Sequence, residues 1–386
     1  MTRPARILLV AAESSGDRLG ADLMRAMRSG CERELEFFGT GGAGMAAEGL
    51  HSAFDISELS VLGLFEAVSA YPRVVRRADE VAALANEVQP DIAVLIDSWG
   101  FTLRVAQRLR AQIPDLPLVK FVGPQVWATR AGRAATLAKT VDHLLTIHSF
   151  DAPMFEAHGL ETTFVGNPAL EREWSGDGTA FRARHAIPAH ANVLSVLFGS
   201  RPAELRRIYE PFARAVGRLR EANPDLSVVV PLAEPIEAAA RERLADDLRM
   251  SGVVIVGEAE KADAFAATNL ALACSGTVTT ELATLGVPAV VGYRLAWPTW
   301  ALLRAFLLRS KYVSLVNIAA GRELLTERVQ TQTTGRKLAR ACQEWLDDPA
   351  RRAETSKALI ETTRSMRGDG RAAERAAAVI CGMLPD

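Results

Sequence analysis

The chain has 386 residues, which is too long for one ordinary hydrophobic core and indicates two or three domains. Hydrophobic residues make up 49% and charged residues 24%, which is typical of soluble globular proteins and excludes disorder, collagen and coiled coil as the main architecture. The formal net charge of -1 argues against a strongly basic nucleic-acid binder, so no nucleic-acid partner is expected. Acidic side chains are in slight excess over residues 1–175 and basic ones after them, which is either noise or the mark of an anionic ligand in the second half.

Short apolar runs alternate with alanine- and arginine-rich, helix-like stretches along the whole chain. The N-terminal segment is basic and then apolar, but Glu13 and Asp17 follow so soon that it predicts a first strand and not a signal peptide. Most runs lack strict alternation, as is typical of parallel strands buried on both faces, so the rhythm predicts doubly wound parallel sheets. The predicted strands are Ile7–Ala11, Leu35–Gly39, Ile92–Ile96, Leu118–Phe121, Leu144–Ile147, Thr163–Val165, Leu194–Phe198, Ser227–Val230, Val253–Val256, Leu270–Ala273 and Ala289–Val291, with helices such as Leu19–Arg28 and Pro202–Ala222 between them.

The rhythm restarts near the middle of the chain. The stretch Glu171–Pro188 is polar and punctuated by Gly and Pro, which is typical of a linker. We therefore predict an N-terminal Rossmann-like domain over 1–175, a second Rossmann-like domain over 188–333, and C-terminal helices over 334–386. Ligands bind outside the carboxyl ends of such strands, so a central cleft between the domains is the expected active site.

Two features of the first half could carry chemistry. The first strand runs into Glu13-Ser14-Ser15-Gly16-Asp17, a small turn before a helix, which suits an anionic ligand but could equally be a helix cap. Asp97 ends the apolar run VLID, where a carboxylate would face the cleft. It is a candidate general base, and the alternative is a cap for the next helix.

Two turns of the second half have the same strand–turn–helix form. Gly199-Ser200-Arg201 places an arginine where its planar fork could hold a phosphate, and the alternative is a salt-bridged surface arginine. Cys274-Ser275-Gly276-Thr277 opens a helix whose free N–H groups could cradle a diphosphate. Glu281, one turn along, could accept hydrogen bonds from ribose hydroxyls.

Other patterns narrow the chemistry and the location. No P-loop, zincin, G-x-S-x-G or D-x-D pattern occurs, so no metal and no cofactor are expected. The four cysteines lie far apart without a C-x-x-C pair, which predicts a reducing compartment and no zinc site. No apolar run is long enough to span a bilayer, so a cytoplasmic protein is expected. Val61–Val75 and Trp297–Leu308 carry aromatic and basic flanks that suit either an interfacial helix or a core or dimer helix.

Taken together, these motifs resemble the lipid-A-disaccharide synthases, inverting glycosyltransferases of the GT-B fold. The resemblance runs from Ile7 to about Gln330 in the right order. The matching segments are AAESSGDRLGADL, FFGTGGAGMAAEG, SVLGLFEAV, PDIAVLID, GPQVWATRAGR, FVGNP, FGSRPAEL, CSGTVTTELATLGVPAVVGYR and KYVSLVNIAAGRELLTERVQ.

The resemblance implies a reaction and roles for individual residues. The family joins UDP-2,3-diacylglucosamine to 2,3-diacylglucosamine 1-phosphate (lipid X), giving the β-1,6-linked disaccharide 1-phosphate and UDP without a metal. By resemblance Asp97 is the base for the acceptor 6-hydroxyl and Arg201 the ligand of the donor diphosphate. The further residues are Glu13, Ser15, Gly16 and Asp17 for substrate, and Ser200, Ser275, Gly276, Thr277, Glu281, Asn317 and Gln330 for UDP. The family also implies peripheral attachment to the cytoplasmic face of the inner membrane and a domain-swapped homodimer, with the C-terminal helices returning to the first domain or to the partner chain.

Several motifs depart from the family pattern, mainly in the first half. I-D-x-P-D-F becomes Ile96-Asp97-Ser98-Trp99-Gly100-Phe101, P-F-E becomes Ser149-Phe150-Asp151, and G-H-P becomes Gly166-Asn167-Pro168. The donor blocks are nearly intact. Two alternatives therefore stay open: a paralogous GT-B transferase with another UDP-sugar or lipid acceptor, and an inactive sugar-nucleotide-binding protein.

Overall fold

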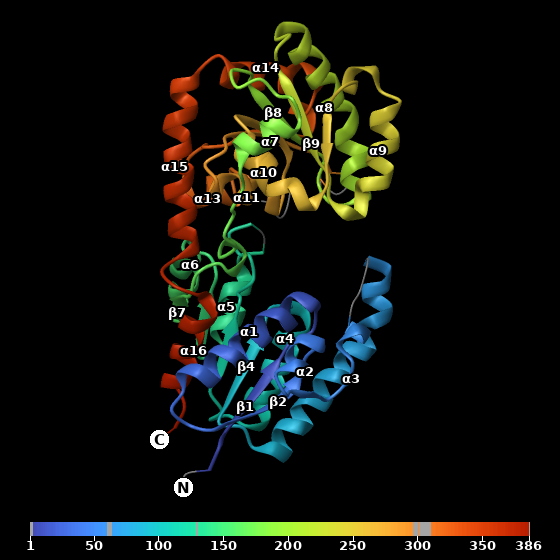
Figure 1. Ribbon diagram of the computed structural model, residues 1–386. Coiled ribbons are helices and arrows are strands. Elements are labelled where there is room, and N and C mark those ends of the chain that lie inside the picture. Colours follow the sequence, from blue (N-terminus) through green and yellow to red (C-terminus); the bar gives the residue numbers. More distant parts are fainter. Residues whose placement is uncertain (1–2, 60–63, 129, 296–299, 301–309, 386) are drawn as a thin grey trace. The chain divides into compact units, whose positions relative to one another are not determined.

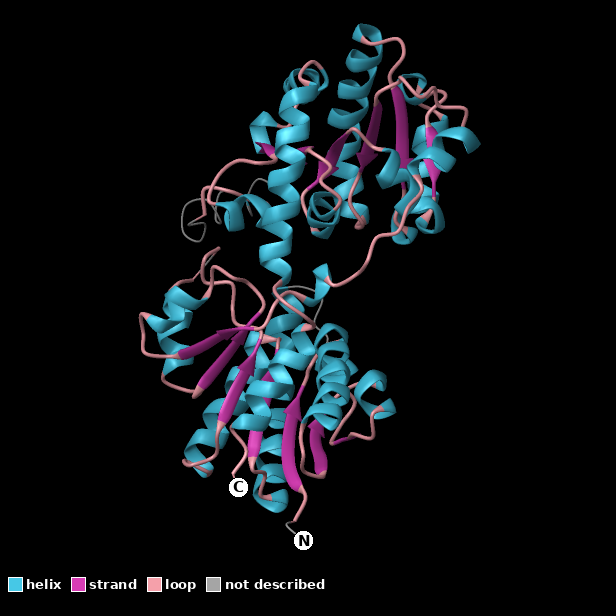
Figure 2. Ribbon diagram, turned by 60° about the vertical axis from the view of Figure 1, so that its left-hand side comes forward, coloured by secondary structure: helices cyan, strands magenta, loops and turns pink. Residues whose placement is uncertain are grey.

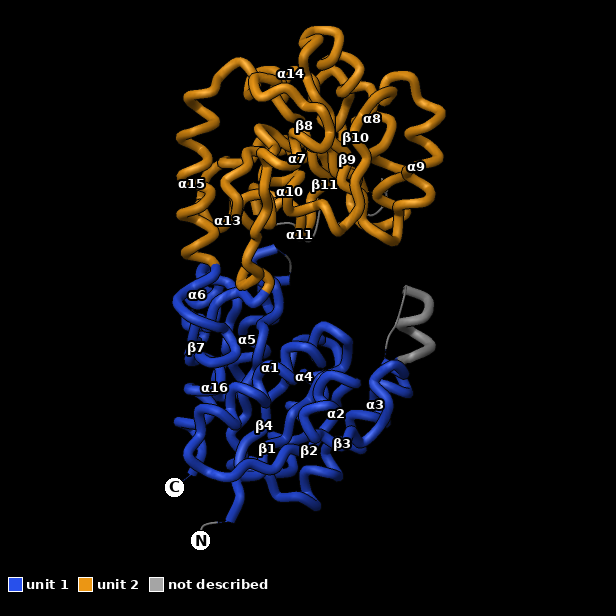
Figure 3. The backbone as a smooth tube through the Cα atoms, in the orientation of Figure 1, with its two compact units in different colours: residues 1–168, 367–386 blue, residues 169–366 orange. Residues whose placement is uncertain are grey.

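The computed structural model divides the chain into two compact units, residues 1–168 with 367–386, and residues 169–366 (Figure 3). It describes residues 3–59, 64–128, 130–295, 300 and 310–385. Of the two stretches with aromatic and basic flanks, residues 61–63 of the first and all but residue 300 of Trp297–Leu308 lie outside this description. Among the described residues no helix combines the length and the apolar character needed to cross a bilayer.

The first unit is a parallel sheet covered by helices on both faces. Within the described residues the sheet has seven strands in the order β3-β2-β1-β4-β5-β6-β7 (Figure 2). Its strands are β1 (Ala5–Val10), β2 (Leu35–Thr40), β3 (His51–Ser52), β4 (Ile92–Ile96), β5 (Leu118–Phe121), β6 (His143–Thr146) and β7 (Glu161–Phe164). Its helices are α1 (Ser14–Gly30), α2 (Ala43–Ala47), α3 (Leu64–Val88), α4 (Trp99–Gln112), α5 (Gly132–Ala138), α6 (Ala152–Glu156) and α16 (Ala372–Gly382).

The second unit repeats this plan. Its described strands form a parallel six-stranded sheet in the order β10-β9-β8-β11-β12-β13. They are β8 (Val193–Leu197), β9 (Ser227–Pro231), β10 (Val254–Val256), β11 (Leu270–Cys274), β12 (Ala289–Tyr293) and β13 (Thr326–Val329). The helices are α7 (Gly178–Arg184), α8 (Pro202–Ala222), α9 (Glu237–Ala245), α10 (Lys261–Ala267), α11 (Thr277–Thr284), α13 (Leu315–Ala320), α14 (Gly335–Leu346) and α15 (Pro349–Arg367) (Figure 1).

Every predicted strand is confirmed to within two residues at either end, and the helix Pro202–Ala222 is confirmed with the same bounds. The central strands lie between two helical layers, so both faces of each are buried, and the five residues of β4 are all fully buried. The pattern missed β3 and β13, which end their sheets. An edge strand is short and only partly buried, and it therefore leaves a weak apolar signal.

Part of the predicted linker is a folded element. Residues 178–184 form α7. The Asp177 carboxylate caps this helix by accepting hydrogen bonds from the N–H groups of Thr179 at 3.0 Å and Ala180 at 2.9 Å. Phe181 on this helix is fully buried in a cluster with α10 and β8. The interpretation of Glu171–Pro188 as a linker is therefore wrong for this segment, because one apolar anchor and one cap hold it on the second unit.

The C-terminal helices are divided between the units. Trp345 and other apolar residues of α14 pack with α8 in the second unit. Only α16 belongs to the first unit, where it packs beside α1 (Figure 1). Cys381 of α16 forms a disulfide with Cys31 just after α1, with Cα atoms 5.8 Å apart. The wide spacing of the cysteines gave no sign of this pair, because helix packing joins residues 350 positions apart.

Candidate active site

The first sheet reverses its strand order between β1 and β4, and the polar residues predicted from the first half meet there. In α/β sheets such a switch point leaves a crevice at the carboxyl ends of the strands. Asp97 follows β4, and the Ser15 hydroxyl donates to its Oδ2 at 3.1 Å. The Ser98 hydroxyl donates to Glu13 Oε1 at 3.2 Å. Residues 82 to 85 positions apart thus form one polar cluster, in which Glu13 and Ser15 are exposed and Asp97 and Ser98 partly exposed.

Two further predicted residues of the same turn, Gly16 and Asp17, support the fold around the cluster. Gly16 is buried, and the backbone of α1 passes close to the end of β4 there. Asp17 accepts hydrogen bonds from the backbone N–H groups of Gly42 and Gly44 at 2.8 Å and of Met45 at 2.9 Å. Its carboxylate therefore stabilises the N-terminus of α2 and holds the glycine-rich turn after β2.

The second sheet has its switch point between β8 and β11, where the second group of predicted residues lies. Gly199 has a φ of +88°, and a Cβ there would lie 2.3 Å from Glu204 Oε2, so only glycine fits. Glu204 accepts from the N–H groups of Ser200 at 3.0 Å and Arg201 at 3.2 Å. The Arg201 side chain is 77% exposed and contacts only Glu204, at 3.3 Å, among the residues described, so its guanidinium is available to an anion.

The turn after β11 presents an uncapped helix start. Gly276 is the N-cap of α11, and no side chain of a described residue caps the first N–H groups of the helix. Gly276 and Thr277 are exposed and Ser275 is partly exposed, so these donors can reach a ligand. Glu281 lies on the same helix, with its Oε2 buried and 3.0 Å from the Lys261 ammonium.

Asn317 and Gln330 are engaged in holding backbone. Asn317 is fully buried: its Oδ1 accepts from Leu324 and Leu325 N–H groups at 2.8 Å, and its Nδ2 donates to the Leu325 carbonyl at 2.8 Å and to Glu327 at 2.9 Å. Gln330 accepts from the Leu295 N–H at 2.6 Å. Both polar atoms of the Asn317 amide are therefore already hydrogen-bonded and are not available to a nucleotide. Both side chains hold the backbone of neighbouring loops in place.

A buried polar cluster that the sequence did not single out follows β5 and β6. The rings of Trp127, His148 and Phe150 pack together, and the last two stack with centroids 5.3 Å apart. Asp151 is 2% exposed and accepts from the Thr146 hydroxyl at 2.7 Å. Burial raises the pKa of Asp151 to about 7 and lowers the pKa of His148 to about 4. The signal in the sequence was the departure Ser149-Phe150-Asp151.

We expect Asp151→Asn to change how stability depends on pH. The folded protein keeps the Asp151 proton up to about pH 7, whereas the unfolded chain loses it near its ordinary pKa of 3.8. Wild-type stability therefore falls as the pH rises through this window, and the asparagine variant avoids the loss. Urea unfolding at pH 5 and pH 8 should show the variant gaining roughly 2 kcal/mol on wild type at the higher pH.

The exposed Asp115→Asn serves as the matched control, with no such gain expected. His148 acts in the opposite direction, since a lowered pKa makes stability rise between about pH 4 and its ordinary value of 6.5. Comparing each variant with wild type at one pH cancels this contribution. Equal pH dependence in D151N and wild type would contradict a buried, proton-holding carboxyl at this position.

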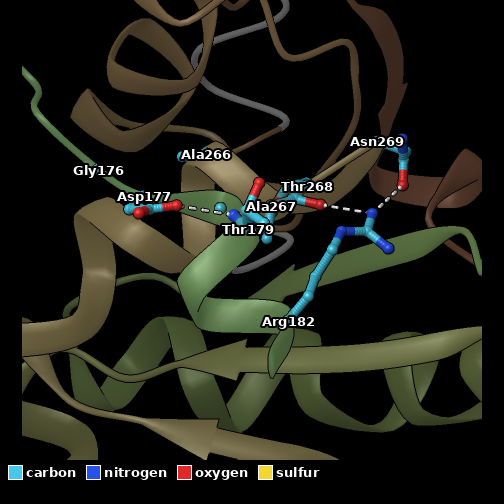
Figure 4. A pocket seen from close by; sticks show the side chains of 9 residues that line it. Gly176, Asp177, Thr179, Arg182, Ala266, Ala267, Thr268 and Asn269 are labelled. Carbon is cyan, nitrogen blue, oxygen red and sulfur yellow. Dashed lines mark hydrogen bonds between the residues drawn. The ribbon is translucent and has the colours of Figure 1, made fainter. Parts of the chain in front are cut away.

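A cavity of about 480 Å³ lies at the amino ends of the strands of the second sheet. It is lined by residues of α7 and of the segment from α10 to β11, with Arg182 donating to the Ala267 carbonyl and to Asn269 Oδ1, each at 3.0 Å (Figure 4). Asn269 precedes β11, whereas Ser275 follows it. The cavity therefore lies at the amino ends of the strands and is separate from the candidate site.

Comparisons with known proteins show the family of the chain. A family model described as lipid-A-disaccharide synthetase matches residues 7–380. The lipid-A-disaccharide synthase of Rhodospirillum centenum is 41% identical over 384 residues, covering 99% of this chain and 95% of that protein. That of Myxococcus xanthus is 37% identical over 387 residues, covering 100% and 99%.

Solved structures show the fold. MurG of Acinetobacter baumannii matches with a TM-score of 0.61 at 14% identity, covering 98% of this chain and 99% of that chain. This likeness and the two parallel-sheet units identify the GT-B fold. With the match over nearly all of its length, the chain belongs to the lipid-A-disaccharide synthase family of glycosyltransferases.

Proposed function

We propose that the chain joins UDP-2,3-diacylglucosamine to 2,3-diacylglucosamine 1-phosphate (lipid X), giving the β-1,6-linked lipid A disaccharide 1-phosphate and UDP. One observation carries the proposal: each sheet has, at its switch point, the residue type that one half of the reaction needs. The first unit has the partly exposed carboxylate of Asp97 for the acceptor. The second has the exposed Arg201 and the uncapped start of α11 for the donor diphosphate.

In the proposed mechanism the Asp97 carboxylate takes the proton of the acceptor 6-hydroxyl as that oxygen attacks the anomeric carbon of the donor. The bond from this carbon to the β-phosphate oxygen breaks, and UDP leaves with the electron pair. Arg201 and the N–H groups at Gly276 and Thr277 stabilise the charge that develops on the diphosphate. A single displacement inverts the anomeric centre and forms no covalent intermediate.

The substrate assignment also bears on location and assembly. Both proposed substrates carry acyl chains, so we propose that the protein collects them at the cytoplasmic face of the inner membrane. Tyr71 on α3 supports an interfacial role for this helix, since its side chain is 54% exposed among basic neighbours. The domain-swapped homodimer stays a prediction from the family resemblance.

The test is an assay of purified protein with both lipid substrates in mixed micelles. We expect equimolar release of UDP and of a β-1,6-linked disaccharide 1-phosphate, identified by mass spectrometry and NMR. UDP binding without disaccharide from lipid X, but with product from another lipid acceptor, would overturn the acceptor assignment. UDP binding without turnover of any acceptor would favour a sugar-nucleotide-binding protein.

A further inference from the structure

A lysine lies inside the first sheet, close beneath the candidate base. Lys120 is a residue of β5, paired in register with Leu95 of β4 and Leu144 of β6. It is 2% exposed in a sheet core whose other side chains at this level are apolar. A lysine in such a place is costly, because burial removes the water that solvates its ammonium.

The ammonium has oxygen partners but, among the described residues, no carboxylate in contact. Its Nζ donates to the main-chain carbonyl of Asp97 and, at 2.9 Å, to the hydroxyl of the fully buried Thr102 on α4. Across the described chain no salt bridge involves Lys120, and the Asp97 charge is the one that acts on it. Burial lowers the pKa of Lys120 to about 7, which supports a net desolvation cost. The side chain therefore lowers stability, and its position needs a reason other than stability.

The partners of Lys120 hold a strained piece of backbone. Asp97 and Ser98 have φ values of +48° and +36°, a region that non-glycine residues seldom adopt. The Thr102 hydroxyl bridges the Asp97 and Ser98 carbonyls at 2.9 Å each, and Lys120 binds the same hydroxyl and the Asp97 carbonyl. The direction of the Asp97 side chain follows from this backbone conformation, because the carboxylate projects from the same Cα that the carbonyl fixes.

We propose that Lys120, with Thr102, is a positioning residue for the Asp97 carboxylate: it anchors the Asp97 carbonyl from beneath and so orients the base toward the acceptor hydroxyl. The inference rests on the proposed function, because it gives Asp97 the role of base. It assigns to Lys120 no contact with substrate. Its effect therefore belongs in kcat and not in the binding of either substrate.

The test is Lys120→Met, which keeps an unbranched apolar chain of about the length of the lysine stem and removes the Nζ donor and its charge. We expect kcat to fall tenfold or more while both KM values stay within twofold and the melting temperature stays equal or rises. In wild type, Lys120 loses its proton near pH 7 in the folded protein and near pH 10.5 in the unfolded chain, so wild-type stability rises between these values. The gain in melting temperature of K120M over wild type should therefore be larger at pH 6.5 than at pH 9.5. Thr102→Val should lower kcat threefold or more.

A mutant cycle separates this inference from the proposed function. In an Asp97→Asn background, Lys120→Met should change the residual rate less than twofold, because there is no base left to orient. The exposed Lys139→Met is the matched control and should leave kcat and melting unchanged. Wild-type kcat in both K120M and T102V, with D97N impaired, would overturn the inference alone. A parallel loss of kcat and melting temperature in K120M would make Lys120 structural and would also overturn it. A D97N variant with wild-type rate would instead remove the base and the proposed mechanism.

Discussion

Asp97→Asn should lower kcat about 100- to 10,000-fold, the range that general-base catalysis contributes. Asparagine keeps the size and the hydrogen bond from the Ser15 hydroxyl, but it cannot take a proton from the acceptor. Asp97 lies at the switch point of the first sheet, whereas the residues proposed to bind the donor diphosphate lie at the switch point of the second sheet. The affinity for UDP should therefore stay within twofold. Single-turnover product formation measures the first quantity and calorimetric titration with UDP the second.

The matched control is at the other end of the same strand. Asp91 precedes β4, pairs with Arg3 at 2.6 Å and accepts from the Arg6 N–H at 2.9 Å. Asp91→Asn therefore removes one charge of the same sheet at its amino edge, and kcat should stay within twofold. If D97N turned over the substrates at the rate of D91N, Asp97 would not be the base.

Arg201→Ala should lower kcat/KM about 100- to 1,000-fold, as the loss of one donor to developing charge does in other enzymes. The guanidinium is 77% exposed and held only by Glu204 among the described contacts, so it can turn to a diphosphate without breaking a buried network. The affinity for UDP should fall more than the affinity for uridine, which lacks the phosphates. Arg201→Lys should restore part of the rate, because lysine keeps the charge but lacks the two-pronged donor.

Arg214→Ala on α8, the helix that follows Arg201, serves as the control. Arg214 is an exposed arginine that pairs with Glu210 one turn away at 2.5 Å, and the variant should keep wild-type kinetics. Glu204 accepts the main-chain N–H of residue 201, which alanine keeps, so R201A should also melt within a few degrees of wild type. An equal loss of uridine and UDP affinity in R201A would argue against a phosphate-directed role.

Much of the architecture was predictable, because buried parallel strands are short, continuous apolar runs bounded by turns. The runs Ile92–Ile96 and Leu118–Phe121 recur unchanged as β4 and β5. The helix Pro202–Ala222 was equally clear, since Pro202 opens it and Glu204 caps it. The motifs at the carboxyl ends of β4, β8 and β11 followed from these strands, which is why Asp97, Arg201 and Ser275 could be singled out.

The sequence by itself therefore determined the strands, the repeated α/β plan and the turns that carry polar residues, because each depends on neighbours within a few positions. The tertiary structure alone decided which distant groups meet. It joined Ser15 to Asp97, Cys31 to Cys381, and Asp17 to the turn at Gly42. It also hydrogen-bonded the Asn317 amide to the main chain, and it brought the Lys120 ammonium to the Asp97 carbonyl. Such contacts depend on strand order and helix packing, and no local pattern encodes either.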